Sequence, residues 1–474
     1  MESIKKLNLF LEIFFLIFLF FLPFNGLPYF KEIFKELSAE ASYYPLYIFV
    51  FLSFIYYLFK RKEFKFTKNY SFYLFVAFIV WVLVSGVVNY NRIYLNYFKY
   101  RTGTEKFMLQ FMVLSFVFLV SLFLYNFFRK YDLDDLFRRI RNIVVLSFIV
   151  ILFFGFFEFL KKFLGIDNII ENFRGFITIG YKGYGDRLHS TCGEPSWFGV
   201  YLTFGLPWIL SCFIERIRLK YFVLYFFIFL FSYFTFSRTV YIIFVIQTFV
   251  FSLIIGFYDK NYKKMLKYFI VFCIPSILLF LNTAITSIIS TQNQNKKDPR
   301  GFLKYYAITS IISTQNQNKY AGSNITRIGM QTAGVKIGLD NPLFGVGLGQ
   351  FGFNFPKYLP EWSLDSPEIK SYLDPNDKFF PPSHGLFPRL IAETGFVGFF
   401  IYISMLVFII IKSVLGFVSR FEYFYLNLII LLSCIGFLLI GFTVDSFRYI
   451  IYWFIISLFW RLEYEFERKK NIIN

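Results

Sequence analysis

Residues 383–411 read SHGLFPRLIAETGFVGFFIYISMLVFIII, and this stretch decides the class of fold. It joins a short polar segment that contains glycine directly to an uninterrupted apolar run. As an α-helix, about 20 apolar residues cross a hydrocarbon core of roughly 30 Å. His384 therefore lies at the mouth of a predicted membrane helix, and the chain has only one other histidine, His189.

The composition of the whole chain extends this interpretation. Hydrophobic residues make up 57% of the 474 residues and charged residues 17%, whereas a soluble protein has about 25% charged residues. We count about twelve apolar segments of spanning length: 7–24, 43–59, 70–88, 107–128, 143–160, 194–214, 220–236, 239–257, 267–283, 390–411, 423–441 and 444–460. The sequence thus predicts an all-α, polytopic integral membrane protein.

The distribution of Lys and Arg predicts the orientation in the membrane, because cytoplasmic loops carry an excess of both. Basic residues cluster at 60–68, 129–141 and 461–470, which are cytoplasmic if the N-terminus is cytoplasmic. Both termini are then expected in the cytoplasm. The loop 89–106 is an exception, since it is basic and yet falls on the outer side.

The chain divides into three predicted parts. They are nine membrane helices with an outer loop at 161–193 (1–283), a long extracytoplasmic loop (284–383), and three membrane helices with a cytoplasmic tail (384–474). The long loop contains AITSIISTQNQNK twice, at 284–296 and 307–319, which we interpret as a solvent-exposed insertion. After the repeat, apolar spacing predicts a helix over 323–339, and Asn341 before a proline is expected to end it.

The net charge of +19 has two interpretations: attraction to anionic lipid headgroups, or an outer surface that serves an anionic substrate. Nucleic acid is not expected as a partner, because the basic residues are dispersed between the spans. The cysteines and histidines show no metal-ligand spacing. We therefore expect neither a metal nor a cofactor.

Several ionisable residues lie at predicted span ends, where a charge is costly unless it faces a cavity or a partner. Arg187 and Glu194 flank His189 in RLHSTCGEPSWFGVYL, Arg238 lies in the short turn FTFSRTVY, and Arg327 lies in SNITRIG. Structural alternatives exist for each. Arg187 could pair with Glu194, Glu194 could cap the following helix, and the stem of Arg238 could extend along the membrane interface.

One motif adds a family resemblance. His384, Gly395 and Gly398 form a His-x10-Gly-x-x-Gly pattern downstream of NPLFGVGLGQF, and this pattern resembles the bacterial O-antigen ligase/polymerase family. The segment GEPSWFGVYL is similar to the polymerase members. Arg174 and Arg327, each followed after ten residues by glycine, also look like polymerase motifs.

The resemblance implies metal-independent glycosyl transfer, with inversion, from a polyprenyl diphosphate carrier. In this interpretation His384 is the catalytic base and Glu194 a second catalytic candidate, while Arg187, Arg327 and Arg238 bind the diphosphate. Guanidinium groups match phosphate oxygens in pairs, and imidazole has a pKa of about 6.5, which suits a base. The alternative for His384 is capping or packing at the helix mouth.

The leading functional hypothesis is a polymerase that joins lipid-linked repeat units of a surface polysaccharide, O-antigen or capsule. A ligase that transfers the finished glycan to a lipid core or protein is the nearest rival, and a lipid-linked glycan flippase is an alternative of another class. A transporter commonly has related halves, which we do not find, and Glu158 and Glu393 fall near span ends rather than deep within spans. The expected location is the bacterial inner membrane. Expected partners are a polyprenyl-diphosphate-linked glycan, a glycan acceptor, membrane lipids and other polysaccharide assembly proteins.

Overall fold

The computed structural model of the chain describes residues 2–27, 29, 40–166, 169–178, 187–215, 218–259, 317–419 and 423–473. The predicted ninth span, 267–283, lies outside the described residues. So do the first copy of the duplicated segment and most of the second copy.

Long helices coincide with eleven of the twelve predicted spans in the described part of the chain. They are α1 (Glu2–Phe20), α3 (Tyr43–Phe59), α4 (Tyr70–Val88), α6 (Gly103–Phe128), α7 (Leu133–Leu164), α9 (Pro195–Glu215), α10 (Leu219–Phe234), α11 (Arg238–Asp259), α18 (Leu386–Ser419), α19 (Phe424–Ile440) and α20 (Ile450–Ile473). By length and hydropathy, α4, α6, α7, α9, α11 and α18 can each cross a membrane, and α3, α10 and α19 are shorter apolar helices. The all-α membrane fold is confirmed, whereas the number of twelve spans remains a prediction.

Local sequence signals account for where several helices begin and end. The side chains of Asn69, Thr102 and Asp132 each accept a backbone N–H from the first turn of α4, α6 and α7. Such caps satisfy amide groups that have no partner within the helix. Gly165 ends α7 in a left-handed conformation with φ 67°, which glycine adopts without steric cost.

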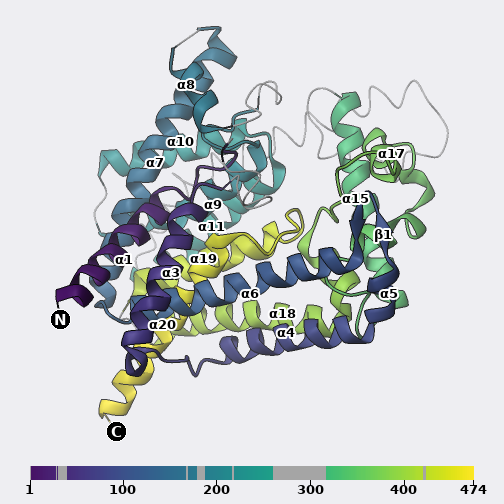
Figure 1. The fold of residues 1–474 in the computed structure, drawn as a ribbon. Helices are drawn as coiled ribbons and strands as arrows, with labels where there is room; N and C mark the ends of the chain where they lie inside the picture. Colours follow the sequence, from purple (N-terminus) through teal and green to yellow (C-terminus); the bar gives the residue numbers. More distant parts are fainter. Residues whose placement is uncertain are drawn as a thin grey trace.

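The helices pack through aromatic side chains. Phe75 of α4 stacks on Trp453 of α20 with ring centroids 4.6 Å apart, and the indole of Trp460 donates a hydrogen bond to Ser71 Oγ (2.8 Å). Figure 1 shows α4, α6 and α18 lying side by side, and α18 also packs against α15 (Gln317–Asp340) and α19. Both chain ends lie on one side of the bundle, opposite α8 (Ile169–Ile177) and α17 (Pro367–Leu373).

The last predicted span was placed six residues too early. Residues 441–449 are not helical; α20 starts at Ile450 and continues to Ile473, so the predicted cytoplasmic tail is helical. Residues 441–449 instead bind the start of α18. The carbonyl of Gly441 accepts the N–H of Leu386 (2.7 Å), and the side-chain Oδ2 of Asp445 accepts the N–H of Ser383, just before the helix (2.8 Å). Apolar composition alone could not reveal these long-range bonds.

Residues 317–384 form an outer layer with a small core of its own. The predicted helix over 323–339 is confirmed as α15, which ends at Asp340 as expected. The remainder is short helices: α16 (Phe351–Asn354), η4 (Phe355–Lys357), η5 (Glu361–Ser363) and α17. Buried side chains hold these pieces together: Met330, Ala333, Ile337, Val346, Phe351, Phe355, Tyr372 and Ala392.

The structure also explains why the loop 89–106 is basic. It forms α5 (Tyr90–Leu95) and a two-stranded hairpin, β1 (Tyr97–Phe98) and β2 (Arg101–Thr102), beside the outer layer. Three of its basic side chains bind that layer: Arg92 contacts Asn341 Oδ1, Lys99 the carbonyl of Ser371, and Lys106 the ring of Phe380. Because these three basic side chains bind the protein itself, they are poor indicators of which side of the membrane the loop lies on.

Candidate functional site

The backbone of His384 is fixed on both sides just before α18 begins. Its φ of 57° lies in the left-handed region, which is uncommon for a residue other than glycine and persists where the surroundings hold it. The carbonyl of His384 accepts a hydrogen bond from Gln331 Nε2 (2.9 Å), and the same amide donates to the carbonyl of Phe442 (2.7 Å). His384 is thus tied to α15 and, through Gln331, to the 441–449 loop.

The imidazole of His384 contacts α17 and stays partly accessible. Its Nε2 lies 3.1 Å from the hydroxyl of Tyr372, and that hydroxyl donates to Glu368 Oε1 (2.7 Å). His384 Nε2 and Glu368 Oε1 are 3.9 Å apart, and the side chains of His384 and Glu368 are 15% and 41% exposed. The ring therefore has an ordered partner at Nε2, and part of its surface remains exposed.

Four charged groups from different elements act on this imidazole. Burial and the Arg327 guanidinium lower the pKa of His384, while Asp445, Glu368 and Glu194 raise it. The balance is a lowered pKa, so the ring is neutral and able to accept a proton at neutral pH. Arg327, Glu194 and His384 are far apart in sequence, and the fold places both charged groups within electrostatic range of His384.

The other two predicted arginines lie at the turn between α10 and α11. Arg238 is the first residue of α11 and lies within electrostatic range of Arg327. Arg187 Nε donates to the carbonyl of Thr235 (2.9 Å), three residues before Arg238. Arg238 thus joins the group around His384 through Arg327, whereas Arg187 is placed at the neighbouring turn.

Glu194 has the position of a helix cap as well as a place near His384. It directly precedes α9, its carbonyl accepts the N–H of Phe198 (3.2 Å), and its Oε1 accepts the hydroxyl of Ser196 (2.6 Å). The capping interpretation and the interaction with His384 are therefore compatible.

The second histidine belongs to a buried ion cluster. Glu158 contacts Lys162 Nζ (2.7 Å), Arg174 (3.1 Å) and His189 Nε2 (3.5 Å), and it also accepts the backbone N–H of Ser190 (2.7 Å). Burial is the main cause that lowers the pKa of His189. Arg174 and His189 are fully enclosed here, so this cluster anchors the 187–194 segment and does not offer its guanidinium to a ligand.

The glycine-rich motif forms a break in α18 that supports the site. Gly395 has φ 68° and ψ −179° inside the helix, which leaves carbonyl groups of the preceding turn without helical partners. The NPLFGVG loop satisfies them: Val346 N–H donates to the carbonyl of Ala392 (2.9 Å) and Gly347 N–H to that of Glu393 (3.0 Å). The two motifs noted in the sequence are therefore one structural unit.

The buried carboxylate of that unit links it to the 441–449 loop. Glu393 pairs with Arg389 (3.1 Å), and Arg389 also donates to the carbonyl of Asp445 (2.5 Å) and to Gln110 Oε1 (2.8 Å). Arg389 thus connects three elements near the backbone of His384: the glycine break in α18, the 441–449 loop and α6.

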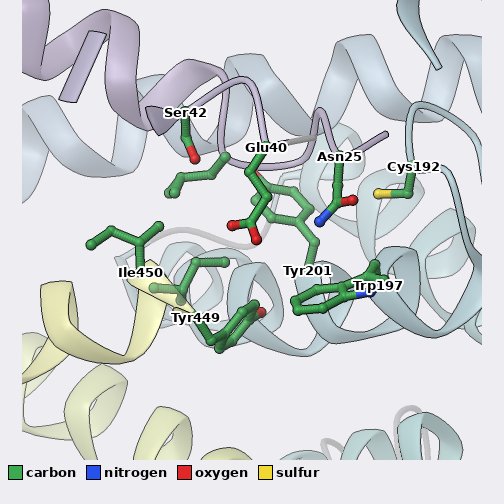
Figure 2. Close-up of a pocket in the computed structure, with 10 residues that line it drawn as sticks. Asn25, Glu40, Ser42, Cys192, Trp197, Tyr201, Tyr449 and Ile450 are labelled. Carbon is green, nitrogen blue, oxygen red and sulfur yellow. The ribbon is translucent and has the colours of Figure 1, made fainter. Parts of the chain in front are cut away.

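A small pocket with both polar and apolar lining residues lies beside α9 and the end of the 441–449 loop (Figure 2). Glu40, Asn25, Trp197 and Tyr449 are among its lining residues. Glu40 pairs with Arg448 (3.3 Å), and burial raises the pKa of this carboxyl to about 7 although Arg448 opposes the shift. The pocket adjoins α9 just after Glu194.

Sequence reasoning missed Tyr372, Glu368 and Gln331. All three lie in the outer layer, residues 317–384, whose polar composition does not show which side chains make contacts and which face solvent. The i,i+4 spacing of Glu368 and Tyr372 is the one signal that could have indicated a pair on a helix. Within the described residues, no group of three His, Cys, Asp or Glu side chains has a geometry that could hold a metal ion.

The fold and the site define an integral membrane protein with a cluster of histidine, arginine and carboxylate groups at one mouth of its helices. Residues 223–403 match the family model described as O-antigen ligase. This match supports the O-antigen ligase/polymerase family that the sequence predicted, and members of this family are membrane enzymes that act on glycans. A search of curated proteins gave no match to the chain.

Proposed function

We propose that this protein extends a lipid-linked surface polysaccharide, O-antigen or capsule, by glycosyl transfer from a polyprenyl diphosphate carrier. The observation that carries the proposal is that His384 lies within electrostatic range of Arg327 and Glu194, and that Arg327 in turn lies within electrostatic range of Arg238. A neutral base beside fixed positive charges is what transfer from a diphosphate requires. The diphosphate leaving group needs charge stabilisation, and the acceptor hydroxyl needs a group that takes its proton.

The proposed step is a single displacement. The acceptor hydroxyl oxygen attacks the anomeric carbon while His384 takes the hydroxyl proton. The bond from the anomeric carbon to the diphosphate oxygen breaks, and the polyprenyl diphosphate leaves with its negative charge held by Arg327 and Arg238, with Arg187 contributing from the neighbouring turn. Attack opposite to the leaving group inverts the anomeric centre, and the chain's own cations supply the charge stabilisation without a metal.

Glu194 completes the proposed site as a second carboxylate near the base. Its negative charge favours the protonated form of His384, and therefore stabilises the imidazolium that forms as the acceptor loses its proton. We assign Glu194 this electrostatic role and keep His384 as the group that receives the proton.

A ligase activity is the second candidate, because the matching family model is described as an O-antigen ligase. Polymerase and ligase share the donor and the displacement step and differ in the acceptor. A lipid-linked repeat unit as acceptor gives chain extension, whereas a lipid core or protein acceptor gives ligation.

We further propose that the site faces away from the cytoplasm of a bacterial inner membrane, with both termini cytoplasmic. Both chain ends lie on the side of the bundle opposite α17 (Figure 1), which is consistent with this orientation. Membrane lipids and other polysaccharide assembly proteins are the proposed partners.

The test is a reconstituted transfer assay. The purified full chain in nanodiscs is incubated with a defined polyprenyl-diphosphate oligosaccharide, alone or with a lipid-core acceptor, and products are followed by mass spectrometry. Extension by whole repeat units supports the polymerase, and transfer to the lipid core alone supports the ligase. Absence of any new glycosidic bond, with a folded protein that binds the donor, would contradict the proposal.

A further inference from the structure

We infer that Tyr372 and Glu368 fix the tautomer of His384, with Nε2 protonated, so that Nδ1 is the atom that accepts the proton of the acceptor hydroxyl. This inference rests on the proposed function of His384 as a base. Tyr372 and Glu368 are positioning residues in it, because they act through the imidazole and do not contact the reacting atoms.

The Tyr372 hydroxyl contacts both Glu368 and His384 but has one proton to donate, and this decides the direction of the two hydrogen bonds. The Tyr372 hydroxyl has a single proton and lies 2.7 Å from Glu368 Oε1 and 3.1 Å from His384 Nε2. An ionised carboxylate can only accept, and hydrogen bonds to a charged acceptor are shorter and stronger than neutral ones. The phenol proton therefore belongs to the contact with Glu368, and the phenol oxygen is left to accept a proton from Nε2.

The other ring nitrogen is the one left for chemistry. In the described part of the chain, the hydrogen-bond contact of the His384 ring is made by Nε2, which leaves Nδ1 as the other ring nitrogen, and the side chain is 15% exposed. A neutral imidazole that donates from Nε2 carries its lone pair on Nδ1. Nδ1 is thus the basic nitrogen of the ring.

Packing holds the two partners in place. Tyr372 is buried in the outer-layer core, its ring stacks on that of His384 with centroids 5.9 Å apart, and Glu368 lies one helical turn before it in α17. The backbone of His384 is fixed separately by Gln331. The imidazole therefore has little freedom to rotate and exchange its two nitrogens.

The chain of contacts also stabilises the product of proton transfer. When Nδ1 takes a proton, the imidazolium keeps its Nε2–H bond to Tyr372, whose own proton remains with Glu368. Burial and Glu368 both raise the pKa of the Tyr372 phenol, so Tyr372 stays protonated throughout. The charges that face the ring are Arg327 from α15, Glu368 from α17, Asp445 from the 441–449 loop and Glu194 before α9, and of these Glu368 is the one coupled through a hydrogen-bonded hydroxyl.

The test uses the small number of histidines. The full chain with ¹⁵N-labelled histidine contains two imidazoles, and a His384→Gln sample identifies which signals belong to His384. Two-bond proton–nitrogen spectra of the native protein in nanodiscs then give the tautomer directly. We expect Nε2–H for His384, and a predominant Nδ1–H form would overturn the inference.

Two variants extend the test to function. Tyr372→Phe keeps the buried ring but removes the acceptor for Nε2–H, so we expect mixed tautomers and a loss of kcat of about 10- to 100-fold, by analogy with groups that orient metal-bound histidines, with little change in KM. Tyr358→Phe is the matched control, because its hydroxyl contacts Asp340, and it should leave both the spectra and kcat unchanged. A single Nε2–H tautomer in Tyr372→Phe would overturn the role of Tyr372.

The outcomes separate this inference from the proposed function. If His384→Ala abolishes transfer but the native tautomer is Nδ1–H, the function stands and the inference fails. If the tautomer is Nε2–H and responds to Tyr372→Phe but His384→Ala transfers glycan at the native rate, the hydrogen-bond assignment stands and the role of His384 as base fails.

Discussion

The substitution Gly395→Ala tests whether the break in α18 is required by the fold. Gly395 combines φ 68° with ψ −179°, a region of backbone space that is essentially restricted to glycine and costs about 1–3 kcal/mol for other residues. A Cβ at this position would also collide with the carbonyl oxygen of Leu343 and lie 2.7 Å from that of Pro342. Both obstacles are backbone atoms, which cannot move aside as a flexible side chain can.

The rest of the expected loss in unfolding free energy comes from hydrogen bonds between the loop 342–347 and α18. Phe396 N–H donates to the carbonyl of Pro342 (2.8 Å), next to the bonds made by Val346 and Gly347. Each contributes about 1 kcal/mol, and moving the loop by the distance that a methyl group needs weakens all three. Together with the backbone term, we expect Gly395→Ala to lower the free energy of unfolding by about 3–5 kcal/mol.

Gly165→Ala is the matched control for this substitution. Gly165 has nearly the same φ, 67°, but no atom lies within 4 Å of a Cβ built there. Its cost is therefore the left-handed backbone alone, about 1–2 kcal/mol. Unfolding by SDS in mixed micelles, followed by tryptophan fluorescence, compares the two; Trp81 is a suitable reporter because its indole donates to the carbonyl of Thr394 (2.9 Å). Equal destabilisation by both substitutions would refute the argument that the loop and the break form one unit.

Four further predictions follow from the site and its surroundings. His384→Ala should lower turnover by about 10²–10⁴-fold while labelled donor still binds, and near-native turnover would exclude the base assignment. Glu368→Gln removes a negative charge 3.9 Å from Nε2 that raises the pKa of His384; the pKa of His384 and the acidic limb of the kcat–pH profile should therefore move to lower pH, and an upward shift would contradict the sign. Glu158→Gln leaves the Arg174 guanidinium buried beside a neutral group and should cost about 3–5 kcal/mol of unfolding free energy in the same SDS assay; native stability would show that the cluster is not an anchor. Single cysteines introduced at 357–380 should react with an impermeant reagent in intact cells, whereas those at 60–69 should require permeabilisation, and reaction of both from one side would contradict the proposed orientation.

The buried ion cluster shows where residue type misleads a sequence-based interpretation. Arg174 and Arg327 have the same spacing to a following glycine, yet Arg174 is enclosed with Glu158 and His189 while Arg327 acts on His384. The two histidines differ in the same way, since His189 is buried and His384 is partly exposed. Burial depends on what the rest of the chain packs against a residue, and no local pattern encodes it.

The sequence by itself determined the all-α membrane class, the positions of most long helices, the end of α15 before a proline, and the family. These are properties of composition, of short-range spacing and of motif residues, because the apolar length of a helix and its end signals depend on neighbouring residues. Even here the start of α20 was misplaced, because the bonds that keep residues 441–449 out of a helix come from α18.

The tertiary structure alone decided which of these residues share a site. It brought Arg327 and Glu194 to His384, added Tyr372 and Glu368, assigned Arg174 and His189 to an internal anchor, and closed the Gly395 break with a loop from fifty residues upstream. Each is a contact between segments far apart in the chain. Such contacts depend on how the apolar faces of the helices pack, because the energy of a buried charge or an unpaired carbonyl is set by the groups that the whole fold places beside it.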